Sequence, residues 1–396
     1  MTSLRGRNFL QTPGPTNIPD RILNAMHRPA VDFSAPDFIE LANSCFRDLK
    51  QVFKTRGEVF IYTASGHGAW EATLVNILSP GDTVLMPETG RFSLVWRDMT
   101  ESLGIKVVET PNDWRSAIDP ATVQRVLSND KNHEIKAVLV VHTETATGVT
   151  SDIPAIRKAM DAAGHPALLV VDAIASLMTV DLPMDDWGVD VVIAASQKGL
   201  MMPPGISFTA VSAKALEVST HSVMPREYWS WASRMDQESY RRFCGTAPEH
   251  MIFGLRESID MIFEEGMDAV FTRHARNAEA VRKAVAVWCS DGPLEFNAVT
   301  PEQRANSITC IRTPEDTYAN DIRTVCRDTF NVSLGGGLAA LTGRAFRIGH
   351  MGDLNEPMII GALGGIEATL QILDVPHGKG GVMAAVDYLA QTATRR

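Results

Sequence analysis

Short apolar segments alternate with amphipathic stretches between residues 58 and 212, and this alternation constrains the fold more than any other feature. The runs at residues 137–141, 168–171 and 191–194 are apolar throughout, as expected of strands covered on both faces of a sheet. We therefore predict an α/β fold, a three-layer sandwich with a mainly parallel central sheet. The other predicted elements are strands at 59–63, 83–86, 106–109 and 207–211 and helices at 119–128 and 152–163.

The remainder of the chain predicts two further parts. Residues 1–35 are rich in proline and turn residues, so we expect an extended N-terminal arm that packs on another surface, for example that of a partner subunit. We predict a large domain over residues 36–264 and a small C-terminal α+β domain over residues 265–396. A long helical pattern with polar breaks at 250–289 leads out of the large domain. The elements predicted after it are strands at 307–312 and 345–348, helices at 318–330, 355–373 and 379–393, and a glycine turn at 335–337.

Composition excludes several classes of protein. The net charge of -10 argues against a nucleic-acid partner, because a polyanion would be repelled. The five cysteines form no C-x-x-C pair, which predicts free thiols in a reducing compartment and no metal site. Residues 1–11 lack the apolar core of a secretory signal, and no apolar run is long enough to span a membrane. We expect a cytoplasmic protein.

Ligands of open α/β sheets bind beyond the carboxyl ends of the strands, so the residues that follow each strand matter most. Ser65, Gly66 and His67 follow the strand at 59–63 and precede a helix expected from Ala69. Small residues let backbone N–H groups approach a ligand, and the start of a helix carries partial positive charge. The segment is either a phosphate-binding cup or a plain strand-to-helix turn.

Two charged residues and a polar loop follow other predicted strands. Asp172 could pair with a cationic ring nitrogen or cap a turn with Ser176. Lys198 could be a desolvated amine of lowered pKa, able to form a Schiff base, or a lysine whose amine reaches solvent. Residues 142–148 offer hydroxyls that could orient a ligand or cap the next helix.

Taken together, these features point to one cofactor. Pyridoxal phosphate needs an anion site, a carboxylate for its pyridinium nitrogen and an amine for its aldehyde. The cup, Asp172 and Lys198 are expected at the same edge of one sheet. Lys198 would also be the base that moves a proton to and from the substrate Cα.

At this point the chain resembles the class V aminotransferases of fold type I, which include serine–glyoxylate, alanine–glyoxylate and aspartate–glyoxylate aminotransferases. The resemblance covers nearly the whole chain, and six motifs in order make it specific. The motifs lie at residues 12–17, 65–67, 144–148, 171–176, 196–199 and 346–350.

The resemblance implies a role for each matching residue. Lys198 matches the Schiff-base lysine, Asp172 the pyridinium partner, and Thr145 the hydroxyl that binds the phenolic oxygen of the cofactor. Arg347 matches the arginine that binds the substrate α-carboxylate, and Gly14 lies at the mouth of the substrate pocket. Residues matching the phosphate site are Ser65, Gly66, His67 and Gln197. Thr246 matches a threonine that reaches the phosphate of the neighbouring subunit, which implies a homodimer with shared active sites.

Two positions depart from the family pattern. Phe92 stands where relatives often stack Trp on the cofactor ring, so it can stack but offers no N–H. Phe243 stands where relatives often have Tyr, so one phosphate hydrogen bond is expected to be absent, and cofactor affinity to be lower unless another contact compensates.

The implied function is amino transfer from a small L-amino acid to a 2-oxo acid, with glyoxylate as the acceptor and glycine as the product. Serine, aspartate and alanine remain candidate donors. Arg234, Arg241 and Arg242 could bind a second donor carboxylate or belong to a solvated loop.

Three other functions would need features that the sequence lacks. A cysteine desulfurase would need a cysteine on a loop of the small domain, and the glycines at 335–337 are followed by none. A non-catalytic pyridoxal-binding regulator would need a DNA-binding domain, for which an acidic chain of this length has no room. A dinucleotide-dependent oxidoreductase would need a G-x-G-x-x-G after the first strand, which is missing.

Overall fold

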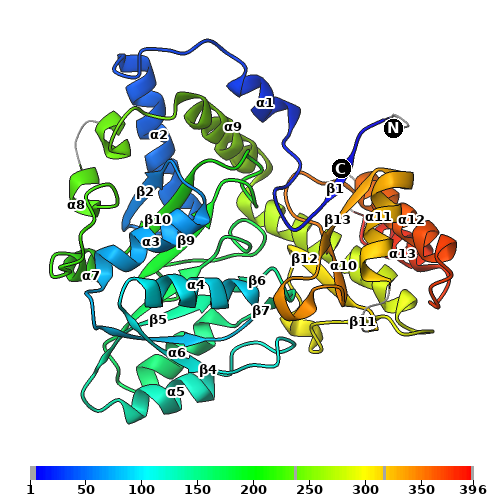
Figure 1. The fold of residues 1–396 in the computed structure, drawn as a ribbon. Coiled ribbons are helices and arrows are strands. Elements are labelled where there is room, and N and C mark those ends of the chain that lie inside the picture. Colours follow the sequence, from blue (N-terminus) through cyan, green and yellow to red (C-terminus); the bar gives the residue numbers. More distant parts are fainter. Residues whose placement is uncertain (1–5, 236–238, 315–317, 394–396) are drawn as a thin grey trace.

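The computed structural model describes residues 6–235, 239–314 and 318–393, and these residues form a large sheet, a small sheet and a two-stranded pair of β6 (Thr143–Glu144) and β7 (Val149–Thr150). The large sheet has seven strands in the order β2-β10-β9-β8-β5-β3-β4 (Figure 1). Six of these seven strands run in the same direction and β10 runs opposite to them, so the predicted mainly parallel sheet is confirmed. The strands are β2 (Glu58–Tyr62), β3 (Thr83–Pro87), β4 (Lys106–Thr110), β5 (Ile135–Val141), β8 (Leu168–Asp172), β9 (Val191–Ala195) and β10 (Ser207–Val211).

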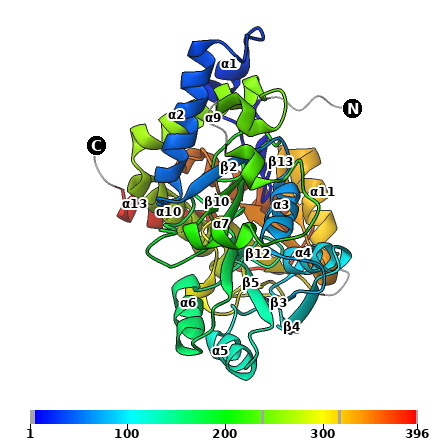
Figure 2. The same ribbon diagram turned by 90° about the vertical axis from the view of Figure 1, so that its left-hand side faces the viewer.

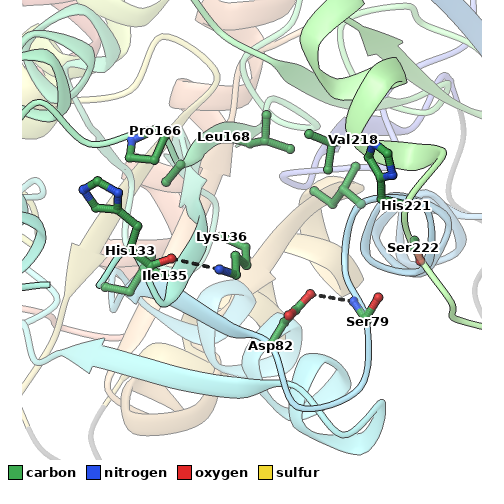
Figure 3. A pocket seen from close by; sticks show the side chains of 12 residues that line it. Ser79, Asp82, His133, Ile135, Lys136, Pro166, Leu168, Val218, His221 and Ser222 are labelled. Atoms are coloured by element: carbon green, nitrogen blue, oxygen red, sulfur yellow. Dashed lines mark hydrogen bonds between the residues drawn. The ribbon is translucent and has the colours of Figure 1, made fainter. Parts of the chain in front are cut away.

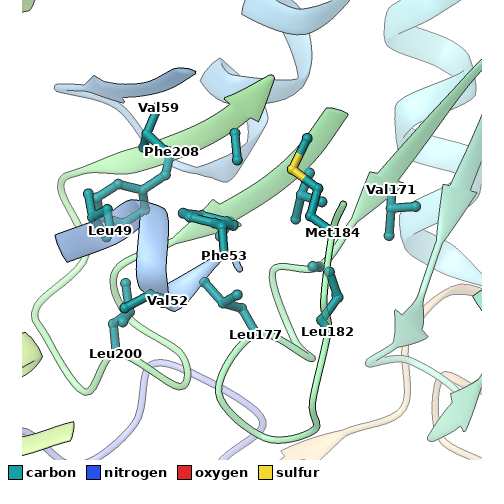
Figure 4. Close-up of a cluster of buried hydrophobic side chains, with 14 of the residues drawn as sticks. Leu49, Val52, Phe53, Val59, Val171, Leu177, Leu182, Met184, Leu200 and Phe208 are labelled. Carbon is teal, nitrogen blue, oxygen red and sulfur yellow. The ribbon is translucent and has the colours of Figure 1, made fainter. Parts of the chain in front are cut away.

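Helices cover both faces of the large sheet, which confirms the three layers (Figures 1 and 2). Along β5, Val138 and Val140 face one core while Leu139 and Val141 face the other. One core packs α2 (Pro36–Val52), α5 (Pro120–Asn129), α6 (Ile153–Ala162) and α9 (Glu249–Glu265) on the sheet; part of it is drawn in Figure 4. The other packs α3 (Gly66–Ile77), α4 (Arg91–Ser102), α7 (Ala213–Ser219) and α8 (Trp231–Arg234).

The small sheet has five strands in the order β1-β13-β14-β12-β11. Its first strand comes from the N-terminal arm and pairs in parallel with β13, whereas the other pairs are antiparallel. The strands are β1 (Phe9–Gln11), β11 (Glu295–Phe296), β12 (Ile308–Arg312), β13 (Val332–Gly336) and β14 (Ala345–Gly349). The helices of this part are α10 (Met267–Trp288), α11 (Ala319–Phe330), α12 (Glu356–Ile372) and α13 (Gly381–Gln391).

The structure corrects four local predictions. The predicted glycine turn at 335–337 is wrong, because Gly335 and Gly336 lie in β13. The helical pattern at 250–289 forms two helices, α9 and α10, separated at Gly266, whose φ is 87°. The arm is not extended throughout, since α1 (Asp20–Met26) packs on α9. The helix expected from Ala69 begins at Gly66.

The boundaries proposed at residues 35 and 264 stay predictions. In the described part of the chain, no helix combines the length and apolar character needed to cross a membrane.

Candidate active site

The predicted site residues converge on one pocket at the carboxyl edge of the large sheet, called here the site pocket. Its volume is about 180 Å³. The lining residues are Ser65, Gly66, His67, Trp70, Phe92, Val141, Thr143, Thr145, Asp172, Ile174, Ala175, Gln197 and Lys198. Eight of these were predicted to hold the cofactor, and they come from segments that follow β2, β3, β5, β8 and β9.

The predicted phosphate cup lies at the start of α3. Ser65 is the residue before the helix, and its side chain makes no capping hydrogen bond. A Cβ on Gly66 would lie 2.4 Å from Ile174 Cδ1, so a larger residue there would require the Ile174 side chain to move. Because α3 starts at Gly66, its first N–H groups and its positive end lie at the pocket wall, an arrangement that suits an anion.

Asp172 ends β8 and is buried. Its Oδ1 accepts a hydrogen bond from Ile174 N at 2.8 Å, and its Oδ2 accepts one from Trp70 Nε1 at 3.1 Å. Burial raises the pKa of Asp172 to about 7, while the two hydrogen bonds and Lys198 act in the opposite direction. A cation brought into the pocket would therefore stabilise this carboxylate.

Lys198 follows β9, and the N-terminal arm reaches it. Its Nζ donates a hydrogen bond to the carbonyl oxygen of Pro13 at 2.5 Å. Gly14 is packed so closely that a Cβ there would lie 2.3 Å from that Nζ. Burial, followed by the charge of Arg347, lowers the pKa of Lys198 to about 8, although Asp172 opposes the shift. An amine with this pKa is partly deprotonated near neutral pH and can act as a nucleophile or a base.

Arg347 lies on β14 and connects the small sheet to the site pocket. Its Nε donates to Gly336 O and its Nη1 donates to Thr145 O, both at 2.7 Å. Two carbonyl acceptors fix the plane of the guanidinium next to the Thr145 segment. Burial lowers the pKa of Arg347, and a bound carboxylate would offset that desolvation.

Aromatic rings form one wall of the pocket. The centroids of His67 and Trp70 are 4.4 Å apart, and those of Trp70 and Phe92 are 6.4 Å apart with the planes at 70°. Trp70 also stacks on Trp96 at 5.5 Å. This packing fixes Trp70, so its N–H stays directed at Asp172.

Several predicted residues lie outside the site pocket of this chain. Thr246 is exposed, and Phe243 is buried against Phe46. Arg234 is fully buried and donates to carbonyls of Ile61, Tyr228 and Arg242. Arg242 lies over the Phe46 ring and donates to Val59 O. These two arginines therefore hold the fold together; Arg241 is exposed, and residues 236–238 of the same predicted loop lie outside the described residues.

Sequence reasoning missed three contributors to the site: Trp70, the Pro13 carbonyl and the carboxylate of Glu144. Trp70 lies three residues after His67, and residues at this spacing share one face of a helix, so the pattern could have placed it at the cup. The Pro13 contact spans 185 residues of sequence and has no local signal.

The residues present fit pyridoxal phosphate. Gln197 lines the pocket, and its buried Oε1 has no hydrogen-bond partner among the described residues, so nothing prevents its side-chain amide from turning its N–H groups toward a bound anion. A buried carboxylate, an amine and a helix start also surround one space. These are the three groups that the ring nitrogen, aldehyde and phosphate of the cofactor require.

A second pocket of about 440 Å³ lies near the amino ends of β3, β5 and β8 and is lined by residues such as Asp82, Ile135 and Leu168 (Figure 3). Its charged groups already have partners. Asp82 accepts from Ser79 N at 2.7 Å, and Lys136 Nζ donates to His133 O at 2.8 Å. Because ligands bind at the opposite edge of such sheets, we place the active site in the site pocket.

The lowered pKa of Lys198 predicts how the cofactor-free protein responds to pH. Below about pH 8 the amine is protonated and cannot attack an aldehyde, so the initial rate of pyridoxal phosphate capture should rise about tenfold per pH unit and level off above pH 8. Mass spectrometry after borohydride reduction measures the captured fraction. A blocked lysine peptide, with its ordinary pKa of about 10.4, is the control and should continue to gain rate beyond pH 9. A protein profile that follows the peptide would contradict the prediction.

A buried lysine of lowered pKa, a buried carboxylate and a helix start at the carboxyl edge of an α/β sheet are the features expected of a pyridoxal-phosphate enzyme. The chain belongs to the class V aminotransferases: the family model described as Aminotransferase class-V matches residues 9–348. It is a transaminase with pyridoxal 5′-phosphate as its cofactor, and the predicted family and fold are confirmed.

Individual aminotransferases are similar to this chain over nearly its full length. The chain is 44% identical over 393 residues to serine–glyoxylate aminotransferase of Methylorubrum extorquens, covering 98% of this chain and 97% of that protein. It is 39% identical over 393 residues to L-aspartate–glyoxylate aminotransferase of Paracoccus denitrificans, covering 98% of each. The crystal structure of ureidoglycine–glyoxylate aminotransferase from Bacillus subtilis is similar with a TM-score of 0.89 at 25% identity, covering 98% of this chain and 100% of that one.

Proposed function

We propose that the enzyme transfers the amino group of L-serine to glyoxylate, forming glycine and the 2-oxo acid of the donor. Amino transfer is supported by one observation: Lys198, Asp172 and the start of α3 all line the site pocket. The acceptor is supported by the relatives, which are named for glyoxylate. Aspartate is the second candidate donor, since one relative is named for it.

We assign the site residues as follows. The N–H groups at the start of α3, with Ser65, His67 and Gln197, would hold the phosphate, and Asp172 would pair with the ring nitrogen. Phe92 would stack on the ring, and Thr145 would donate to its phenolic oxygen. When bound, pyridoxal phosphate supplies an aldehyde for amines and a ring that withdraws electrons.

The chain itself orients the donor and moves the proton. Arg347, whose plane is fixed by two carbonyls, would bind the donor carboxylate and set the direction of the Cα–H bond. Lys198 Nζ would take the proton from Cα, since burial keeps part of its population unprotonated. The Pro13 carbonyl holds this nitrogen on the arm side of the pocket. Gly14 leaves room for it.

We also propose a homodimer in which Thr246 reaches the phosphate of the neighbouring subunit. Its exposure and its position outside the site pocket of its own chain support this arrangement. A monomeric mass in sedimentation equilibrium of the cofactor-loaded enzyme would contradict it.

The donor is tested by steady-state kinetics with L-serine, L-aspartate and L-alanine, each against glyoxylate, pyruvate, oxaloacetate and 2-oxoglutarate. We expect kcat/KM for serine to exceed that for aspartate by at least about tenfold, because a second carboxylate without a cationic partner is costly to desolvate. Arg234 and Arg242 are held by carbonyls of their own chain, which supports the neutral donor.

Arg241→Ala isolates the remaining arginine of this segment. It should leave the serine-to-aspartate ratio unchanged, as should the matched variant Arg125→Ala on the exposed face of α5. A ratio that rises in Arg241→Ala alone would assign the aspartate side chain to this arginine, and a kcat/KM for aspartate above that for serine in the unsubstituted enzyme would overturn serine as the donor. Preference for another acceptor would overturn glyoxylate.

A further inference from the structure

Glu144 is a fully buried carboxylate beside the site pocket that the proposed chemistry does not use. It lies in β6 (Thr143–Glu144), which pairs with β7 (Val149–Thr150). Its Oε1 accepts a hydrogen bond from Ala146 N at 2.9 Å. Its Oε2 accepts from Phe92 N at 2.9 Å and from Ser93 N at 3.3 Å. Both oxygens of this side chain are therefore acceptors for backbone donors.

These donors belong to two segments that line the pocket. Phe92, at the start of α4, supplies the ring of the aromatic wall. Ala146 adjoins Thr145, whose hydroxyl-bearing side chain lines the pocket and whose carbonyl accepts from Arg347. One carboxylate thus connects the stacking ring directly to the loop that carries Thr145 and, through the carbonyl of Thr145, to the substrate arginine.

The surroundings suit a glutamate in its ionised form. Three N–H groups point at the carboxylate, two of them from the positive end of a twelve-residue helix. Space is tight, because a Cβ on Gly90 would lie 2.6 Å from Glu144 Cγ. Two charged groups act on the Glu144 carboxylate. The charge of Asp172 disfavours its ionisation, and the positive charge of Arg347 attracts it.

We propose that Glu144 is a positioning residue that holds Phe92 and the Thr145 loop in the geometry that binds the cofactor. The inference rests on the proposed function, because it takes the site pocket as the pyridoxal phosphate site. Burial raises the pKa of Glu144 to about 7 although the backbone donors oppose the shift, so protonation near neutral pH would remove an acceptor from the start of α4.

The test is Glu144→Gln, in which an NH₂ group must face a backbone N–H. Cofactor dissociation is followed by absorbance after transfer of the loaded enzyme into cofactor-free buffer. We expect dissociation roughly 10- to 100-fold faster than in the unsubstituted enzyme, the range for loss of one or two hydrogen bonds to a charged group. Near-UV circular dichroism of the bound cofactor should weaken. Dissociation from the unsubstituted enzyme should accelerate as pH falls through about 7, and this acceleration should be smaller in the variant.

Glu367→Gln is the matched control. Glu367 lies on α12, is buried and also accepts three hydrogen bonds, from Trp288 Nε1 and from Gly380 N and Val382 N at the start of α13. Its partners belong to α10 and to the start of α13, and it does not line the site pocket. This variant should lower thermal stability to a comparable extent and leave cofactor dissociation unchanged.

Gly90→Ala gives a second variant should Glu144→Gln fail to fold, since the added methyl would displace the Glu144 side chain. It should also speed dissociation. Unchanged dissociation in the substituted enzymes, or equal acceleration in Glu367→Gln, would overturn the positioning role while the cofactor site stands. An unsubstituted enzyme that retains no pyridoxal phosphate would overturn the site assignment itself.

Discussion

Lys198→Ala should lose transaminase activity by at least about 10⁴-fold, because one side chain supplies both the amine that captures the cofactor and the base that moves the Cα proton. The variant should bind pyridoxal phosphate only through non-covalent contacts. Borohydride reduction followed by peptide mass spectrometry should then find the cofactor on Lys198 in the unsubstituted enzyme and on no corresponding peptide in the variant. Single-turnover rates measure the catalytic loss.

Lys214→Ala is the matched control for this experiment. Lys214 lies on α7, is partly exposed and donates to Ala167 O at 3.2 Å, remote from the lining of the site pocket. It should keep both turnover and covalent loading. Turnover by Lys198→Ala at the rate of Lys214→Ala would show that another group is the base, and a label on a different lysine would relocate the cofactor.

Asp172→Asn should lower kcat by about 10²- to 10³-fold, the range for removing one preorganised electrostatic partner. The amide keeps the shape of the side chain but cannot stabilise a protonated ring nitrogen, so the cofactor withdraws fewer electrons from the substrate. An NH₂ group would also have to face either the Ile174 N–H or the Trp70 N–H. The expected signature is a lower kcat with a smaller change in KM, since substrate binding uses Arg347.

Trp70→Phe gives a graded comparison. It keeps the aromatic wall but removes the hydrogen bond to Asp172 Oδ2, so the pKa of Asp172 should rise further and the acid side of the rate profile should move to higher pH. Its loss of activity should be smaller than that of Asp172→Asn. Wild-type rates in Asp172→Asn would refute the pairing with the ring nitrogen.

The sequence predicts the central chemistry because each strand end can be recognised from nearby residues, and the carboxyl ends of parallel strands lie at one edge of the sheet. Asp172 and Lys198 each follow an apolar strand, and parallel neighbours such as β8 and β9 place their carboxyl ends together. The cup after β2 joins them even though β10 lies between β2 and β9, since β10 runs in the opposite direction. The individual roles of these residues stay predictions.

The hydrogen bonds that orient these residues could not be predicted from the sequence. The bond from Trp70 to Asp172 and the bond from Lys198 to Pro13 each join segments far apart in sequence. The prediction of a turn from Gly335 and Gly336 is wrong, because both residues lie in a strand. A Cβ on Gly335 would lie 2.5 Å from Pro13, and one on Gly336 would lie 2.7 Å from Arg323, so close packing accounts for glycine at both positions.

The parallel pairing of β1 with β13 also sets an order of events during synthesis. Residues 9–11 are synthesised before the large sheet, but their partner strand is not complete until residue 336 has been added. The large sheet can therefore form, with Lys198 on it, well before the arm has a strand to pair with. The Pro13 carbonyl therefore gains the support of this strand pair only after β13 has been synthesised, so a fully built site reports that translation has passed β13.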